Sequence, residues 1–79
     1  MKLFEKYVLP KIHESVSCGV KNCVITIDQA YNQSLFCDEN VEHLCEFIEN
    51  FRISKNKTSV TKVESETVFG KRFKIKIRW

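Results

Sequence analysis

The last eight residues of the chain alternate strictly between cationic and apolar side chains. The run is RFKIKIRW, residues 72–79. Because successive side chains of a β-strand point to opposite sides, this pattern predicts a strand with one apolar face and one cationic face. Cationic side chains on such a strand repeat about every 6.6 Å. The apolar face must be covered by other elements, so the pattern predicts a layered fold.

The length of the chain limits what can be built around this strand. The chain has 79 residues, of which 43% are hydrophobic and 29% are charged, as in ordinary globular domains. We expect residues 1–79 to form a single compact domain. A domain of this size buries only about 60 to 65% of the surface of its unfolded chain, which leaves little material for a deep catalytic cleft.

Two segments have the apolar spacing of helices. In residues 2–16 the apolar stripe is Phe4, Val8, Ile12 and Val16. Pro10 interrupts this segment and predicts either a kink or two short helices with the proline in the first turn of the second. The other helix is expected to begin after Asp38 as N-cap and to have Arg52 and Lys55 at its far end, where cations suit the helix dipole. Its apolar stripe is Val41, Leu44, Cys45, Ile48 and Phe51.

Strands are predicted elsewhere. Residues 23–28 (CVITID) are rich in β-branched side chains, and residues 34–37 (SLFC) are expected to form a short strand. Residues 58–68 and 72–79 form a predicted hairpin whose turn is at residues 69–72 and contains Gly70. The resulting fold class is α+β, with two layers: an antiparallel three- to four-stranded sheet and two helices packed on one of its faces.

Charge is distributed unevenly along the chain. The net charge of +3 comes from −4 in residues 1–51 (four lysines, eight acids) and +7 in residues 52–79 (nine Lys or Arg, two acids). We expect the C-terminal cations to gather on the uncovered face of the sheet, where Glu64 and Glu66 would partly neutralise them. The predicted partner- or phosphate-binding residues are Lys62, Lys71, Arg72, Lys74, Lys76 and Arg78.

Two kinds of partner fit such a face. Phosphate backbones are attracted by spaced cations, but the cationic side of the strand has no interleaved aromatic residue on which single-stranded bases usually stack. An acidic protein surface fits equally well. The second helix offers a second possible contact face, made of Glu39, Glu42, Glu46 and Glu49. The same alternation is also typical of a half-exposed strand with no partner, on which lysines discourage aggregation.

The sequence contains few groups suited to metal binding or catalysis. Cys18 and Cys23 are separated by four residues, but Cys37 and Cys45 lack the short spacing of a zinc knuckle. Cys45 also belongs to an apolar helical stripe, where a free cysteine packs as a small hydrophobe. We therefore expect no metal and no cofactor. A small ribonuclease using His13 or His43 is a third, catalytic alternative.

Taken together, these features predict a non-catalytic binding protein. Few Ala and Gly residues beside many Lys, Asn and Ile suggest a phage or mobile-element source. The leading hypothesis is an accessory factor that docks on a host protein complex and modulates or inhibits it. The alternative is direct phosphate-driven binding of nucleic acid. Charged residues and Pro10 interrupt the first segment, so we expect no secretory signal, no membrane partner and a cytoplasmic location, as a monomer or homodimer.

Overall fold

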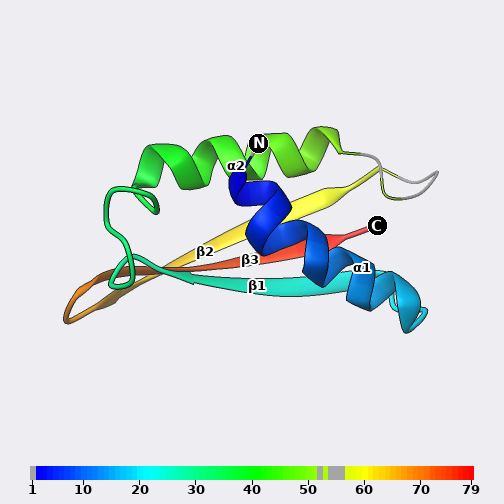
Figure 1. Ribbon diagram of the computed structural model, residues 1–79, viewed down its shortest axis with the longest axis horizontal. Helices are drawn as coiled ribbons and strands as arrows, with labels where there is room; N and C mark the ends of the chain where they lie inside the picture. Colours follow the sequence, from blue (N-terminus) through cyan, green and yellow to red (C-terminus); the bar gives the residue numbers. More distant parts are fainter. Residues whose placement is uncertain (1, 52, 54–56) are drawn as a thin grey trace.

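The computed structural model describes residues 2–51, 53 and 57–79. Figure 1 shows two helices lying across one side of a twisted sheet. In chain order the elements are a π-helical segment η1 (Phe4–Val8), α1 (Leu9–Ser17), β1 (Asn22–Asp28), α2 (Asp38–Asn50), β2 (Ser59–Thr67) and β3 (Gly70–Arg78). The expected α+β class is confirmed, with a three-stranded antiparallel sheet in the order β1-β3-β2.

Pro10 has one of the two arrangements expected from the sequence, in which two helical segments follow one another and the proline lies in the second. It occupies the first turn of α1, and the preceding residues widen into the π-helical segment η1. The backbone N–H of Leu9 donates to the carbonyl of Phe4, five residues earlier. A proline in an ordinary α-helix lacks an N–H and collides with the carbonyl four residues before it. We attribute the π-helical turn to this conflict, because it shifts the bonding pattern just before the ring.

The strand expected at residues 34–37 is not present. Residues 33–36 form turns, in which the Asn32 carbonyl accepts a hydrogen bond from Phe36 N–H at 2.9 Å and Asn32 Oδ1 accepts one from Leu35 N–H at 3.0 Å. Helix α2 then begins at Asp38, with Cys37 as its N-cap. The prediction of Asp38 as the cap was therefore wrong by one position. Helix α2 ends at Asn50, and Arg52 and Lys55, expected at its far end, lie outside the described residues.

The hairpin turn also differs from the prediction. β2 ends at Thr67 and β3 begins at Gly70, so the turn is formed by Val68 and Phe69 rather than by residues 69–72. Gly70 follows the turn with φ of 134°, a conformation that side chains rarely adopt. Turn position fixes the register of a hairpin, and a one-residue change moves side chains to the other face. The observed register pairs Thr67 with Gly70 and Lys62 with Ile75, and this pairing decides which residues of β2 lie on each face of the sheet.

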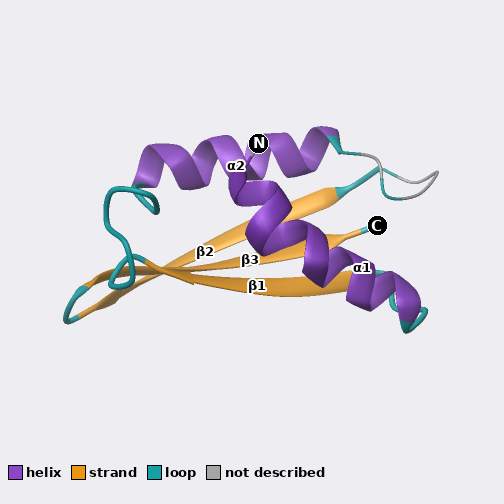
Figure 2. Cartoon of the chain, in the orientation of Figure 1, coloured by secondary structure: helices purple, strands orange, loops and turns teal. Residues whose placement is uncertain are grey.

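The core lies between the helices and one face of the sheet, and Figure 2 shows the two layers. The central strand contributes Phe73, Ile75 and Ile77, which are at most 1% exposed. Burial of each such side chain is worth about 1.5 to 3 kcal/mol. Partners from the other elements are Phe4, Val8, Ile12, Ile25, Ile27, Val41, Leu44 and Ile48. No helix in the described part of the chain has the length and apolar character needed to cross a bilayer.

Candidate functional site

The face of the sheet turned away from the helices, here called the open face, is centred on β3. Its middle row consists of Arg72, Lys74, Lys76 and Arg78, here called the cationic row, and all four side chains are exposed. Their alternation with the buried residues of β3 places them opposite the core. Because β3 is the central strand, the row runs along the middle of the open face and not along its edge.

Apart from Asp28 beside Arg72, short neutral side chains flank the cationic row on both sides. By register, Val24 of β1 lies beside Lys76, and Val63 of β2 lies beside Lys74. The other flanking positions have hydroxyl or amide groups and comprise Asn22, Thr26, Ser59, Thr61 and Ser65. Hydroxyl and amide groups of this kind commonly donate hydrogen bonds to phosphate oxygens. The cationic side chains are therefore longer than those of their neighbours, and several of these neighbours can donate hydrogen bonds.

Asp28 is the one acid among the described strand residues of the open face. Its Oδ2 accepts from Nη2 of Arg72 at 3.2 Å, and its Oδ1 accepts from the backbone N–H of Ala30 at 3.0 Å. The Ala30 bond and then the Arg72 guanidinium hold the pKa of this carboxyl below its usual value of 3.8. Asp28 therefore offsets one charge of the row at one end, while Lys74, Lys76 and Arg78 have no acid as register partner.

Two of the six predicted cations lie on the opposite face of the sheet. Lys62 pairs in register with the buried Ile75, and Lys71 lies two residues before Phe73 on the same side of β3. The expectation that they join the open face was wrong, because Lys62 shares the side of its register partner Ile75 and Lys71 shares the side of Phe73 on its own strand. The same register moves Glu64 and Glu66 to the helix-facing side. The open face consequently loses two cations and two acids together.

Both displaced lysines are engaged in ion pairs. Lys62 Nζ lies 3.2 Å from a carboxylate oxygen of Glu64, and Lys71 Nζ donates to Oδ2 of Asp38 at 2.7 Å. The Asp38 bond raises the pKa of Lys71, and it is the largest cause that lowers the pKa of Asp38. Lys71 thus ties β3 to the first turn of α2, which is a structural role.

Gln29 completes this connection. Its side-chain oxygen accepts from the backbone N–H of Lys71 at 3.0 Å, and its Nε2 donates to Asp38 Oδ1 at 2.9 Å and to the carbonyl of Phe36 at 3.0 Å. One side chain therefore joins β3, the loop after β1 and the start of α2. Gly70 lies against it, because a Cβ at this position would come within 3.3 Å of Gln29 Cβ and Oε1.

The acidic side chains proposed as a second contact face are all exposed on α2. They are Glu39, Glu42, Glu46 and Glu49. Glu42, Glu46 and Glu49 border a shallow groove that also includes Lys62. His43 Nε2 lies 3.9 Å from a carboxylate oxygen of Glu39. The molecule therefore has an acidic side on its helical layer and a basic side on its open face.

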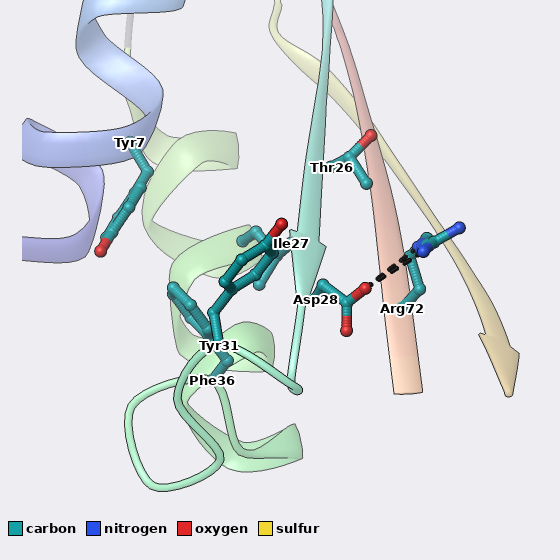
Figure 3. Close-up of a pocket in the computed structure, with 7 residues that line it drawn as sticks. All are labelled: Tyr7, Thr26, Ile27, Asp28, Tyr31, Phe36 and Arg72. Atoms are coloured by element: carbon teal, nitrogen blue, oxygen red, sulfur yellow. Dashed lines mark hydrogen bonds and ion pairs between the residues drawn. The ribbon is translucent and has the colours of Figure 1, made fainter. Parts of the chain in front are cut away.

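A groove of about 580 Å³ wraps around β1 at the Arg72 end of the cationic row. Tyr7 and Tyr31 supply aromatic walls above a floor of Ile27 and Phe36, and the ring centroids of Tyr7 and Phe36 lie 5.3 Å apart in an edge-to-face arrangement. On the open-face side it is bounded by Thr26, Asp28 and Arg72. Figure 3 shows the tyrosines on one side of β1 and the Asp28–Arg72 pair on the other. We call this site the aromatic groove.

The cysteines and histidines are dispersed. His13 lies on α1 and His43 on α2, and neither lines the aromatic groove. The four cysteines are free thiols; burial raises the pKa of Cys23 and of Cys45. Within residues 2–51, 53 and 57–79, no three His, Cys, Asp or Glu side chains are grouped as a metal site would require.

Comparisons with known proteins provide no relative: no family model, no curated protein and no solved structure matches this chain. The sequence interpretation did not identify the aromatic groove. Its aromatic residues are 29 positions apart at the extremes, on a helix and on a loop that was expected to contain a strand. The sequence does show two tyrosines and Phe36 near predicted elements. Their spacing along the chain does not indicate that the three rings lie close together in the fold.

Proposed function

We propose that this chain is a non-catalytic binding protein whose open face binds the phosphate backbone of nucleic acid. The observation that carries the proposal is the register of the hairpin, which leaves the cationic row exposed and puts Glu64 and Glu66 behind the sheet. Hydroxyl and amide side chains beside the row supply further donors for phosphate oxygens. The contacts are made to the backbone, so binding is expected to be weakly selective for sequence.

The geometry also favours a fixed orientation. The acidic side of α2 belongs to the helical layer, whereas the cationic row lies on the other side of the sheet. A polyanion attracts one side and repels the other, so the molecule approaches with its open face first. The field of the row is attenuated by salt, with a screening length of about 8 Å at physiological ionic strength.

Binding to labelled DNA and RNA of equal length, single- and double-stranded, across a salt series tests this proposal. Each phosphate contact contributes about 0.7 to 0.9 to the slope of log affinity against log salt. Three or four contacts predict a slope of about −2 to −3 for single strands. The Lys74→Glu/Lys76→Glu variant should lose its affinity for the labelled DNA and RNA.

A matched control changes the same net charge elsewhere. Lys2 and Lys11 are exposed and belong to the helical layer, which covers the other side of the sheet (Figure 1). The Lys2→Glu/Lys11→Glu variant should bind nearly as well as the unmodified protein. Equal loss of affinity in the two double variants would show that net charge, and not the open face, governs binding. Absence of binding at low salt would overturn the proposal.

A second candidate function is docking on a protein complex, as expected for a phage or mobile-element accessory factor. The observation that favours it is the hairpin turn, where Val68 and Phe69 are 93% and 70% exposed. Turns are usually built from Gly, Asn, Asp, Pro or Ser, so two large apolar side chains at a tip are unusual. A photo-crosslinking residue in place of Phe69 should capture one discrete protein in cells if this function holds. Capture of nucleic acid alone would refute it.

A further inference from the structure

The cationic row and the aromatic groove meet at one residue. Arg72 is the end of the row and also lines the groove. Its neighbour in register is Asp28, and the next pair along the strands is Thr26 with Lys74. Thr26 and Asp28 line the groove as well. Any chain lying over the end of the row is therefore one strand spacing, about 4.8 Å, from the groove.

The walls of the groove suit a flat, partly apolar group. Tyr31 is 86% exposed although it belongs to a loop held by hydrogen bonds, and its ring is available on the groove side (Figure 3). Ile27 and Phe36 are buried and give the groove an apolar floor. Aromatic side chains next to a basic surface are the usual platform for unpaired bases, because every base has a π-face.

The polar rim of the groove matches the edge of a base. Asp28 already accepts two hydrogen bonds from Arg72 on Oδ2 and one from Ala30 on Oδ1, so about one of the four acceptor sites of a carboxylate is left, on Oδ1. The site that remains is suited to one N–H group at the edge of a base. Thr26 adds a hydroxyl at the same rim. The volume of about 580 Å³ falls within the range of small-molecule sites and accommodates a base with its sugar.

We propose that the aromatic groove binds one unpaired base of a nucleic-acid strand whose phosphates lie along the cationic row. This inference rests on the proposed function and narrows its substrate class to nucleic acid with an unpaired base, such as a single strand. It supplies the aromatic contact that is missing among the cations of β3 themselves. Phosphate contacts position the strand, and the base contact discriminates single strands from duplexes.

The test compares two oligomers of equal length and charge, measured by fluorescence anisotropy. One is a mixed-sequence single-stranded DNA, and the other is an abasic oligomer with the same phosphates. Base stacking on an aromatic side chain predicts at least about fivefold tighter binding of the base-containing oligomer. Tyr31→Ala should abolish this preference and leave the affinity for the abasic oligomer unchanged.

Two controls keep the outcomes separate. Tyr31→Phe should retain the preference, and the melting temperature of Tyr31→Ala should stay close to that of the unmodified protein because the side chain is exposed. Equal binding of both oligomers by the unmodified protein, or a preference that survives Tyr31→Ala, would overturn the groove inference and leave the phosphate proposal standing. Failure to bind either oligomer at low salt would instead overturn the proposed function.

Discussion

The two faces of β3 differ in what surrounds them: one is covered by the helices and the other is exposed. Phe73, Ile75 and Ile77 are sealed under the helices, while Lys74 and Lys76, between them in sequence, remain exposed. The difference extends to residues of the same type. Lys71 is tied to Asp38 on the helix-facing side, whereas Lys74 lies on the open face. Two lysines of the same strand therefore differ in accessibility, because their side chains lie on opposite faces of the sheet.

The strongest contrast between the faces is expected in stability. Phe73→Ala removes a fully buried ring, and such truncations cost about 3 to 5 kcal/mol of unfolding free energy. Lys74→Ala, the adjacent substitution on the open face, should change it by no more than about 0.5 kcal/mol. Urea unfolding followed by circular dichroism measures both. Similar losses for the two variants would contradict the assignment of the faces.

The two glycines with positive φ compare the start of β3, at Gly70, with the turn that follows α1, at Gly19. Gly70 has φ of 134° and lies against Gln29, while Gly19 has φ of 74° and no atom within 4 Å of an added Cβ. Gly70→Ala should therefore cost about 1 to 3 kcal/mol, and Gly19→Ala about 1 kcal/mol or less. The same unfolding experiment measures both. A larger loss at Gly19 would show that Gln29 does not restrict position 70.

The smallest expected effect concerns acid sensitivity on the helix-facing side. The pKa of Asp38 is held below 3.8, first by the hydrogen bond from Lys71 and then by the one from Gln29. A carboxyl with a lower pKa in the folded state stabilises the fold above pH 3.8, and this contribution is lost as pH falls through the lowered value. The melting temperature should thus decline below about pH 4.

Two substitutions isolate this contribution. Asp38→Asn removes the titrating group, and Lys71→Gln removes the largest cause of its shifted pKa. Both variants should show a shallower decline of melting temperature between about pH 4 and pH 2 than the unmodified protein. Because the pair is exposed, the change is expected to be modest. An unchanged acid profile in both variants would show that the Asp38–Lys71 pair does not link folding to pH.

Local patterns predicted most of the framework. The alternation of residues 72–79 identified β3 and its two faces, and the apolar spacing around Leu44 identified α2. Both depend on periodicity within one element, which the sequence displays directly. The π-helical adjustment before Pro10 could not be distinguished from a kink, because both relieve the same steric conflict.

Register and loop contacts were not predictable in the same way. The apolar pair at Val68 and Phe69 does not resemble a turn, so the hairpin was placed around Gly70, and the facing of Lys62 and Glu64 was reversed. Lys71 could have been assigned correctly, because it lies two residues before Phe73 and must share its side of the strand. The aromatic groove depends on how residues 29–37 are held by Gln29, a long-range interaction with no local signal.

Observation of individual lysines during binding tests the central claim most directly. Reductive methylation with a carbon-13 label retains lysine charge and gives each side chain an NMR signal. On titration with single-stranded DNA at low salt, the signals of Lys74 and Lys76 should shift, while those of Lys62 and Lys71 stay in place. Shifts at Lys62 and Lys71, or at Lys2 and Lys11 instead, would contradict the assignment of the open face as the binding surface.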